Sequence, residues 1–118
     1  MSNNVAEGNL TSTPEQLARW NRALVTGSAG LDGTTVDQMK CAIPAGATSC
    51  YGLGIEQRSG LGFGHTGAHN GYMSIMSYDP DGDVSIVLFF SLLDFDAMGR
   101  ESMLLIDVVT QARAILGY

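Results

Sequence analysis

The 118-residue sequence has few charged side chains, few cysteines and a single lysine. Charged residues make up 15% of the chain, whereas about 25% is usual for a soluble domain. We therefore expect either an unusually apolar surface or a surface that is partly covered by other protein. Twelve acidic residues against six basic ones give a net charge of −6, which argues against binding to nucleic acid or to an anionic membrane.

Long hydrophobic runs and targeting signals are also missing. No apolar run approaches the length of a transmembrane helix, and the polar start at residues 1–4 does not resemble a signal peptide. If the parent protein is secreted or periplasmic, we expect its signal to lie upstream of this chain. The length allows one small domain, and an apolar content of 45% excludes a chain that is disordered by composition.

The two cysteines, Cys41 and Cys50, flank a short loop of small residues. They either form a disulfide in an oxidising compartment or remain as two thiols, and their spacing alone does not decide between these alternatives. Together with His65 and His69 they could be taken for zinc ligands, but the gap between the cysteines is too long for a zinc knuckle. We therefore expect neither a metal nor another cofactor.

Helix signals appear near the start of the chain. Thr13 suits the N-cap position, Pro14 the first helical position, and Gln16 completes a capping box. Apolar residues then recur at three-to-four spacing until Gly27, which ends the helix. A second, shorter helix is predicted from about Gly33 to Met39.

The second half of the chain has the alternating pattern of β-strands. Residues 79–83 form a hairpin turn in which Asp81-Gly82 is expected to supply the positive φ values. A long helix over about residues 96–116 carries a broad apolar stripe, so we expect it to be largely buried against the sheet. The fold class is therefore α+β: an antiparallel four-stranded meander with an N-terminal helix and a long C-terminal helix packed on the sheet. The four predicted strands cover residues 51–56, 63–66, 72–78 and 84–90.

Two familiar motifs can be set aside. Gly62-x-Gly64-x-x-Gly67 matches a dinucleotide-binding fingerprint, but that fingerprint must open a helix, and a strand is expected here. The acidic residues at positions 79, 81 and 83 resemble the start of a calcium loop. Phe90 stands where the loop needs a glutamate, so a solvated turn is the better interpretation.

The informative motif is Gly64-His65-Thr66-Gly67. A Tyr-Gly-Leu-Gly segment at 51–54 precedes it, a Gly-Tyr strand follows at 71–72, and a Thr-Pro-Glu-Gln-Leu-Ala helix start lies upstream at 13–18. This succession, over nearly the whole chain, resembles the C-terminal region of the serine β-lactamase and DD-peptidase superfamily. The most similar branch contains class C β-lactamases, DD-carboxypeptidases and related esterases. The resemblance implies that residues 1–118 are a single partial domain of a β-lactamase/transpeptidase-like fold.

The resemblance also implies roles for four residues. His65 would give electrostatic and hydrogen-bond support near the reacting centre, and Thr66 would offer its hydroxyl to a substrate carboxylate or acyl group. Gly67 would let the substrate lie close to the strand, and the N–H of Ala68 would form one arm of an oxyanion hole. The substrate would be a β-lactam, an acyl-D-Ala-D-Ala-like peptide or an ester.

The rest of the catalytic apparatus is missing. The family uses Ser-x-x-Lys for its nucleophile and a Tyr-x-Asn or Ser-x-Asn motif, but the residue three before Lys40, the only lysine, is Asp37. Only Ser2-x-Asn4, at the very terminus, matches the second motif formally. In addition, Glu56 stands where some DD-carboxypeptidases carry a cation, which argues against specificity for D-Ala-D-Ala.

Three hypotheses follow. The chain is the C-terminal fragment of a penicillin-recognising serine hydrolase whose missing N-terminal part supplies the nucleophile, and it is inactive alone. Alternatively, it is a non-catalytic truncated homologue that binds a partner or another copy of itself. The third hypothesis, an unrelated α+β domain, is the least favoured because it leaves the order of motifs unexplained.

Overall fold

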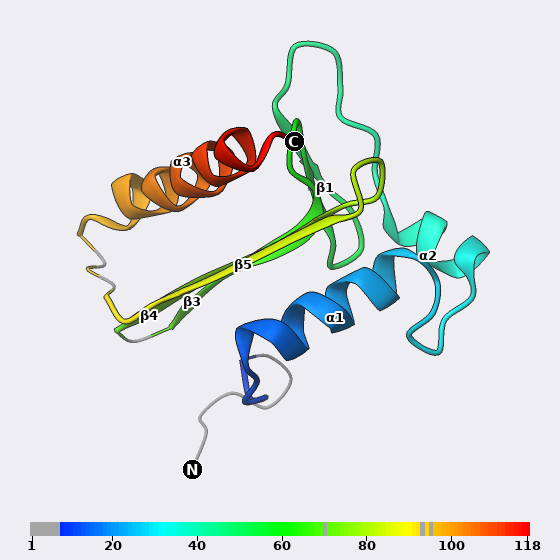
Figure 1. Ribbon diagram of the computed structural model, residues 1–118, viewed down its shortest axis with the longest axis horizontal. Coiled ribbons are helices and arrows are strands. Elements are labelled where there is room, and N and C mark those ends of the chain that lie inside the picture. Colours follow the sequence, from blue (N-terminus) through cyan, green and yellow to red (C-terminus); the bar gives the residue numbers. More distant parts are fainter. Residues whose placement is uncertain (1–7, 70, 93, 95) are drawn as a thin grey trace.

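A computed structural model describes residues 8–69, 71–92, 94 and 96–118 (Figure 1). Its five strands form one antiparallel sheet in the order β1-β2-β3-β4-β5. The predicted α+β class is confirmed, but the prediction of four strands is wrong. In chain order the elements are α1 (Pro14–Val25), α2 (Gly33–Met39), β1 (Ser49–Tyr51), β2 (Glu56–Arg58), β3 (Gly62–His69), β4 (Tyr72–Asp79), β5 (Val84–Phe90) and α3 (Met98–Leu116).

The extra strand arises because the segment predicted as one strand, residues 51–56, contains a turn. The Gly52 N–H donates to the carbonyl oxygen of Ile55 at 2.8 Å, and Gly54 has a φ of +75°. A Cβ at Gly52 would lie only 2.0 Å from the carbonyl oxygen of Met39. The two glycines therefore fold the segment back on itself, and its two ends pair as β1 and β2.

Both predicted N-terminal helices are present. The Gln16 N–H donates to the Thr13 hydroxyl and the Thr13 N–H donates to the Gln16 side chain, both at 3.2 Å. This is the reciprocal capping box that the sequence predicts at the start of α1. Gly27, with a φ of +73°, follows the end of α1. Asp32 caps α2 through the N–H of Thr35 at 2.9 Å.

The two longer helices lie on opposite faces of the sheet (Figure 1). On the α3 face, Met73 and Ile75 of β4 pack against two residues of α3, Leu105 and Val109. On the other face, α1 contacts β4 and β5, and the buried Asn21 bonds to β3. The sheet that carries the histidine motif is therefore held from both sides.

The long C-terminal helix is less buried than the sequence predicts. Only Leu105, Val109 and Arg113 of α3 are buried. The sheet covers only one side of this straight helix, and the apolar stripe is wider than that side. The outer part of the stripe therefore stays exposed. The described part of the chain contains no helix long and apolar enough to cross a membrane. The large apolar side chains that α3 exposes are Met98, Met103, Leu104, Val108, Ile115 and Leu116.

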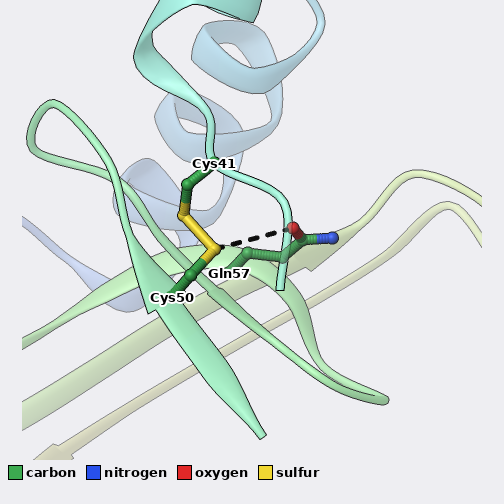
Figure 2. Close-up of a disulfide and its surroundings, with 3 residues drawn as sticks. All are labelled: Cys41, Cys50 and Gln57. Carbon is green, nitrogen blue, oxygen red and sulfur yellow. Dashed lines mark hydrogen bonds between the residues drawn. A yellow bond between two sulfur atoms is a disulfide. The ribbon is translucent and has the colours of Figure 1, made fainter. Parts of the chain in front are cut away.

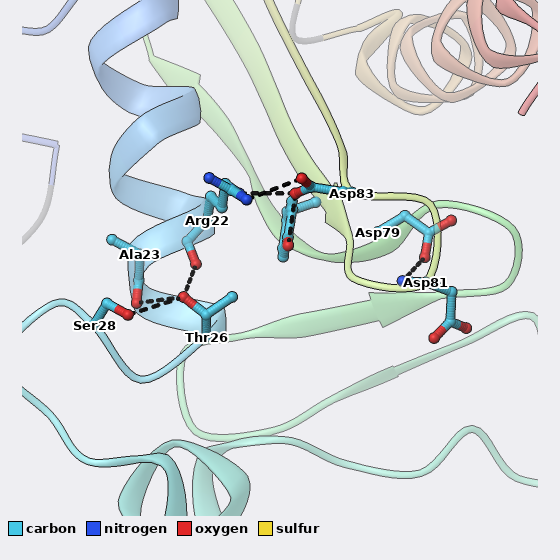
Figure 3. A network of polar contacts seen from close by, with 8 residues as sticks. Arg22, Ala23, Thr26, Ser28, Asp79, Asp81 and Asp83 are labelled. Carbon is cyan, nitrogen blue, oxygen red and sulfur yellow. Dashed lines mark hydrogen bonds and ion pairs between the residues drawn. The ribbon is translucent and has the colours of Figure 1, made fainter.

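The hairpin turn between β4 and β5 differs in detail from its prediction. The positive φ belongs to Asp83, at 51°, and not to the Asp81-Gly82 pair. Aspartate tolerates this left-handed conformation better than most residues. Here Arg22 of α1 donates two hydrogen bonds to its carboxylate (Figure 3), and the Tyr78 hydroxyl donates a third. The turn thereby ties the sheet to α1.

Candidate functional site

Strand β3 carries the predicted site and has an open edge. Its partner β2 pairs only with residues 62–64, whereas β4 pairs with residues 63–69. Among the strands that the structure describes, residues 65–69 therefore have a neighbour on one side only. Main-chain groups at such an edge are available to an extended ligand.

The strand register places the four predicted site residues on alternate faces. His65 lies opposite Met76, and Thr66 lies opposite Ile75. Because opposed residues share a face, Thr66 shares the α3 face with Ile75, and His65 shares the α1 face with Met76. Gly67 follows His65 on the α1 face, and Ala68 follows Thr66. The structure thus brings the four residues together along one edge, with the side chains of His65 and Thr66 on opposite faces.

A groove of about 650 Å³ lies beside this edge, bordered by β3, β4, the end of β5 and the start of α1. Among the described residues, its titratable side chains are His65, His69 and Tyr72, and none of its lining residues is a carboxylate or a lysine. In a chain with a net charge of −6, the described lining of this groove thus carries no acidic group that would repel an anionic ligand. The lining residues to which sequence reasoning gave no role at the site include Leu17, Tyr72, Ser74, Met76 and Phe89.

The imidazole of His65 has protein partners at both nitrogens. Its Nδ1 bonds to the carbonyl oxygen of Thr66, and its Nε2 lies 2.6 Å from the hydroxyl of Tyr51. The Tyr51 and His65 rings also meet edge to face, with centroids 5.5 Å apart. Sequence reasoning placed Tyr51 in a strand but gave it no role at the site. Its place in the Tyr-Gly-Leu-Gly segment was the available signal.

Close packing explains the glycine before the histidine. A Cβ at Gly64 would lie 1.9 Å from the carbonyl oxygen of Met76, so any side chain there would push β3 away from β4. At Gly67 the nearest atom would be the Ser74 hydroxyl, at 2.5 Å, and that side chain can rotate away. Gly64 is therefore required by the sheet, whereas Gly67 leaves the groove face of the strand clear.

Glu56, the acidic residue that argued against specificity for D-Ala-D-Ala, forms an ion pair. Glu56 accepts from Arg58 at 2.7 Å, and the two side chains are only 15% and 27% exposed. Glu56 pairs with Gly64, at the end of β3 that lies away from the open edge. Its carboxylate is absent from the groove lining. Glu56 therefore gives little reason to exclude an anionic ligand.

Cys41 and Cys50 are joined by a disulfide with a Cα–Cα distance of 6.1 Å (Figure 2). Gln57 lies beside it, with Oε1 4.0 Å from the Sγ of Cys50. The bond links the segment after α2 to β1, directly before Tyr51. Because both sulfurs are bonded to each other, neither can serve as a thiolate metal ligand.

The described residues contain no group of three His, Cys, Asp or Glu side chains placed to hold a metal ion. The Gly62-x-Gly64-x-x-Gly67 sequence runs through β3 and is followed by β4. A phosphate-binding helix start is therefore absent from this part of the described chain, and the motif carries no dinucleotide-binding geometry.

Comparison with protein families identifies the chain. A family model described as Beta-lactamase matches residues 1–109. The chain belongs to the Beta-lactamase family. This places it in the serine β-lactamase/transpeptidase-like superfamily of hydrolases. No curated protein matches the chain.

Membership in the Beta-lactamase family makes the missing motifs significant. The sequence contains no Ser-x-x-Lys and no Tyr-x-Asn. The formal match at Ser2 and Asn4 lies outside the described residues. An acyl-enzyme needs a nucleophile with a base in hydrogen-bond reach, and the sequence lacks the Ser-x-x-Lys pair that the family uses for this.

Proposed function

We propose that this chain forms the substrate-binding wall of a serine hydrolase site of the Beta-lactamase family, with the nucleophile supplied by another segment of the parent protein. The observation that carries the proposal is the open edge of β3 at residues 65–69, which lies beside a groove whose described lining has no acidic group. A β-lactam, an acyl-D-Ala-D-Ala-like peptide or an ester would lie along this edge.

Each predicted residue keeps a role in this proposal. His65 supports the reacting centre, and Thr66 binds a carboxylate or acyl oxygen at the strand edge. Gly67 lets the ligand approach the main chain. The N–H of Ala68 serves as one oxyanion donor, because a fixed main-chain donor stabilises charge that develops in the transition state.

The same proposal includes the branch of the superfamily and the cellular compartment of the parent protein. The order of motifs favours a parent related to class C β-lactamases, DD-carboxypeptidases or esterases, with this chain as its C-terminal part. The disulfide between Cys41 and Cys50 favours a secreted or periplasmic parent, because disulfides persist in oxidising compartments.

The test combines binding with intact mass. A penicillin, an acyl-D-Ala-D-Ala peptide and a nitrophenyl ester are each mixed with the chain, and binding is followed by saturation-transfer NMR. We expect weak, reversible binding of at least one ligand and no increase in protein mass. Gly67→Val should abolish binding because its side chain fills the groove face of the strand, whereas Gly99→Val, in open space on α3, should bind as the wild type does.

A second function, self-association, is favoured by a separate observation. Among the described strands β5 pairs only with β4, and its last residues, Phe89 and Phe90, are exposed. The apolar side chains that α3 exposes would be covered by a partner. In a symmetric dimer, two copies of β5 would pair across a twofold axis. Light scattering tests this second function: a dimer at micromolar concentration supports self-association, and a monomer at high concentration argues against it.

A further inference from the structure

The tautomer of His65 follows from its partners. A carbonyl oxygen can only accept, so the Nδ1 that bonds to the Thr66 oxygen must carry a proton. In the neutral ring, Nε2 is then the acceptor, and the Tyr51 hydroxyl 2.6 Å away is its donor. Neither ring nitrogen is left free to contact a ligand in this arrangement.

The position of Tyr51 is fixed by its chain neighbours. The preceding residue, Cys50, is tied to Cys41 by the disulfide. The turn that follows is anchored by the Leu53 N–H, which donates to the carbonyl oxygen of Met39 at 2.8 Å. Although the Tyr51 side chain is 61% exposed, its main chain is restrained on both sides.

We propose that Tyr51 is a positioning residue for His65, holding the imidazole as the Nδ1–H tautomer with Nε2 directed at its hydroxyl. The proposal rests on the proposed function of the groove, since a positioned imidazole matters only if a ligand binds there. Without the Tyr51 hydroxyl, only the Thr66 carbonyl holds the ring. The ring, which lines the groove, then reorients about its side-chain torsions, and the groove is less well ordered for a ligand.

Tyr51→Phe removes one exposed hydroxyl and keeps the ring, so the fold should be retained. Tyr118→Phe is the matched control, because Tyr118 is also 61% exposed and, like Tyr51, is not among the residues that line the groove. The first readout is the long-range ¹H–¹⁵N spectrum of the histidine rings in the ligand-free chain, at a pH where His65 is neutral.

For the wild type and Tyr118→Phe we expect a protonated Nδ1 and a hydrogen-bonded Nε2 at His65. In Tyr51→Phe the Nε2 resonance should move toward that of a nitrogen without a donor, or the second tautomer should appear. Identical His65 ring spectra in the wild type and Tyr51→Phe would overturn the proposed pair.

The second readout is affinity for the tightest ligand of the panel above. Tyr51→Phe should weaken binding by about threefold to tenfold, the range expected when one side chain must be ordered on binding, and Tyr118→Phe should leave it unchanged. Equal affinity of Tyr51→Phe and the wild type overturns the positioning role. If the wild type binds no ligand of the panel, the proposed function and the role of Tyr51 in binding are both wrong. The ligand-free spectra still show whether Tyr51 and His65 form a hydrogen-bonded pair.

Discussion

The buried side-chain amide of Asn21 in α1 donates a hydrogen bond to the main-chain carbonyl oxygen of Phe63 in β3, at 3.1 Å. Asn21 is only 1% exposed, and Phe63 lies two residues before His65. This bond therefore couples the first helix directly to the strand that carries the candidate site.

Asn21→Ala should lower the free energy of unfolding by about 2 kcal/mol, because it removes the hydrogen bond of a buried side chain and opens a small cavity. Urea denaturation measures the change. Asn9→Ala, at an exposed position, should change the free energy of unfolding by less than about 0.5 kcal/mol. Equal effects of the two substitutions would show that the helix–strand bond is unimportant.

Asp79 should make the chain sensitive to acid. Burial raises the pKa of Asp79, but the hydrogen bond from Arg113 and the main-chain N–H groups of Asp81 and Gly82 lower it more, so the pKa lies below its ordinary value. A depressed folded-state pKa stabilises the protein above the unfolded pKa of about 3.9. That stabilisation is lost as the pH falls through the folded-state pKa.

Asp79→Asn should cost about 2 kcal/mol at neutral pH, because it removes the ion pair with the largely buried Arg113. It should also lose less stability than the wild type when the pH falls from about 6 to about 3. Denaturation at several pH values tests both effects. Asp107→Asn, on the exposed side of α3, should follow the wild-type pH dependence; if Asp79→Asn does so too, the ion pair is not the source of acid sensitivity.

Reduction of the disulfide should destabilise the chain. Cys41 and Cys50 are nine positions apart, and opening a loop of this size costs about 2–3 kcal/mol in the chain-entropy model. Urea denaturation with and without a reductant measures the effect. The double variant Cys41→Ser/Cys50→Ser should be as unstable as the reduced wild type and should not respond to the reductant.

Gly52→Ala should be strongly destabilising. Its methyl group would meet the carbonyl oxygen of Met39 at 2.0 Å, so the turn between β1 and β2 must move, at a cost of about 1–3 kcal/mol or more. Gly33→Ala is the control, because a methyl group there has no neighbour within 4 Å. Thermal or urea denaturation compares the two, and a stable Gly52→Ala would mean that the turn can shift freely.

Local signals in the sequence predicted the helices well. Thr13 and Gln16 define the start of α1 because a capping box depends only on residues within one turn. The turn at Gly52 was missed because its cause, the approach of Met39, is a contact between distant segments. The burial of α3 was overestimated for the same reason, since an apolar stripe does not say how much of it meets the sheet.

The candidate site was predictable as a motif but not as a set of contacts. The order of motifs singled out His65, whereas its bond to Tyr51 depends on the strand register and on the turn at Gly52. His65 and Thr66 point to opposite faces because side chains alternate along a strand. This could be predicted as soon as the two residues were assigned to a strand. The open edge of β3 exists because β2 is short, which no local pattern in the sequence indicates.

The most direct test is a ¹H–¹⁵N amide titration of the chain with the tightest ligand of the panel, read at residues 65–68. We predict that the amide resonances of Gly67 and Ala68 shift saturably, that resonances on the exposed side of α3 do not, and that the protein mass stays unchanged. Shifts confined to other surfaces, or a covalent adduct formed by the isolated chain, would contradict a substrate-binding wall that lacks its nucleophile.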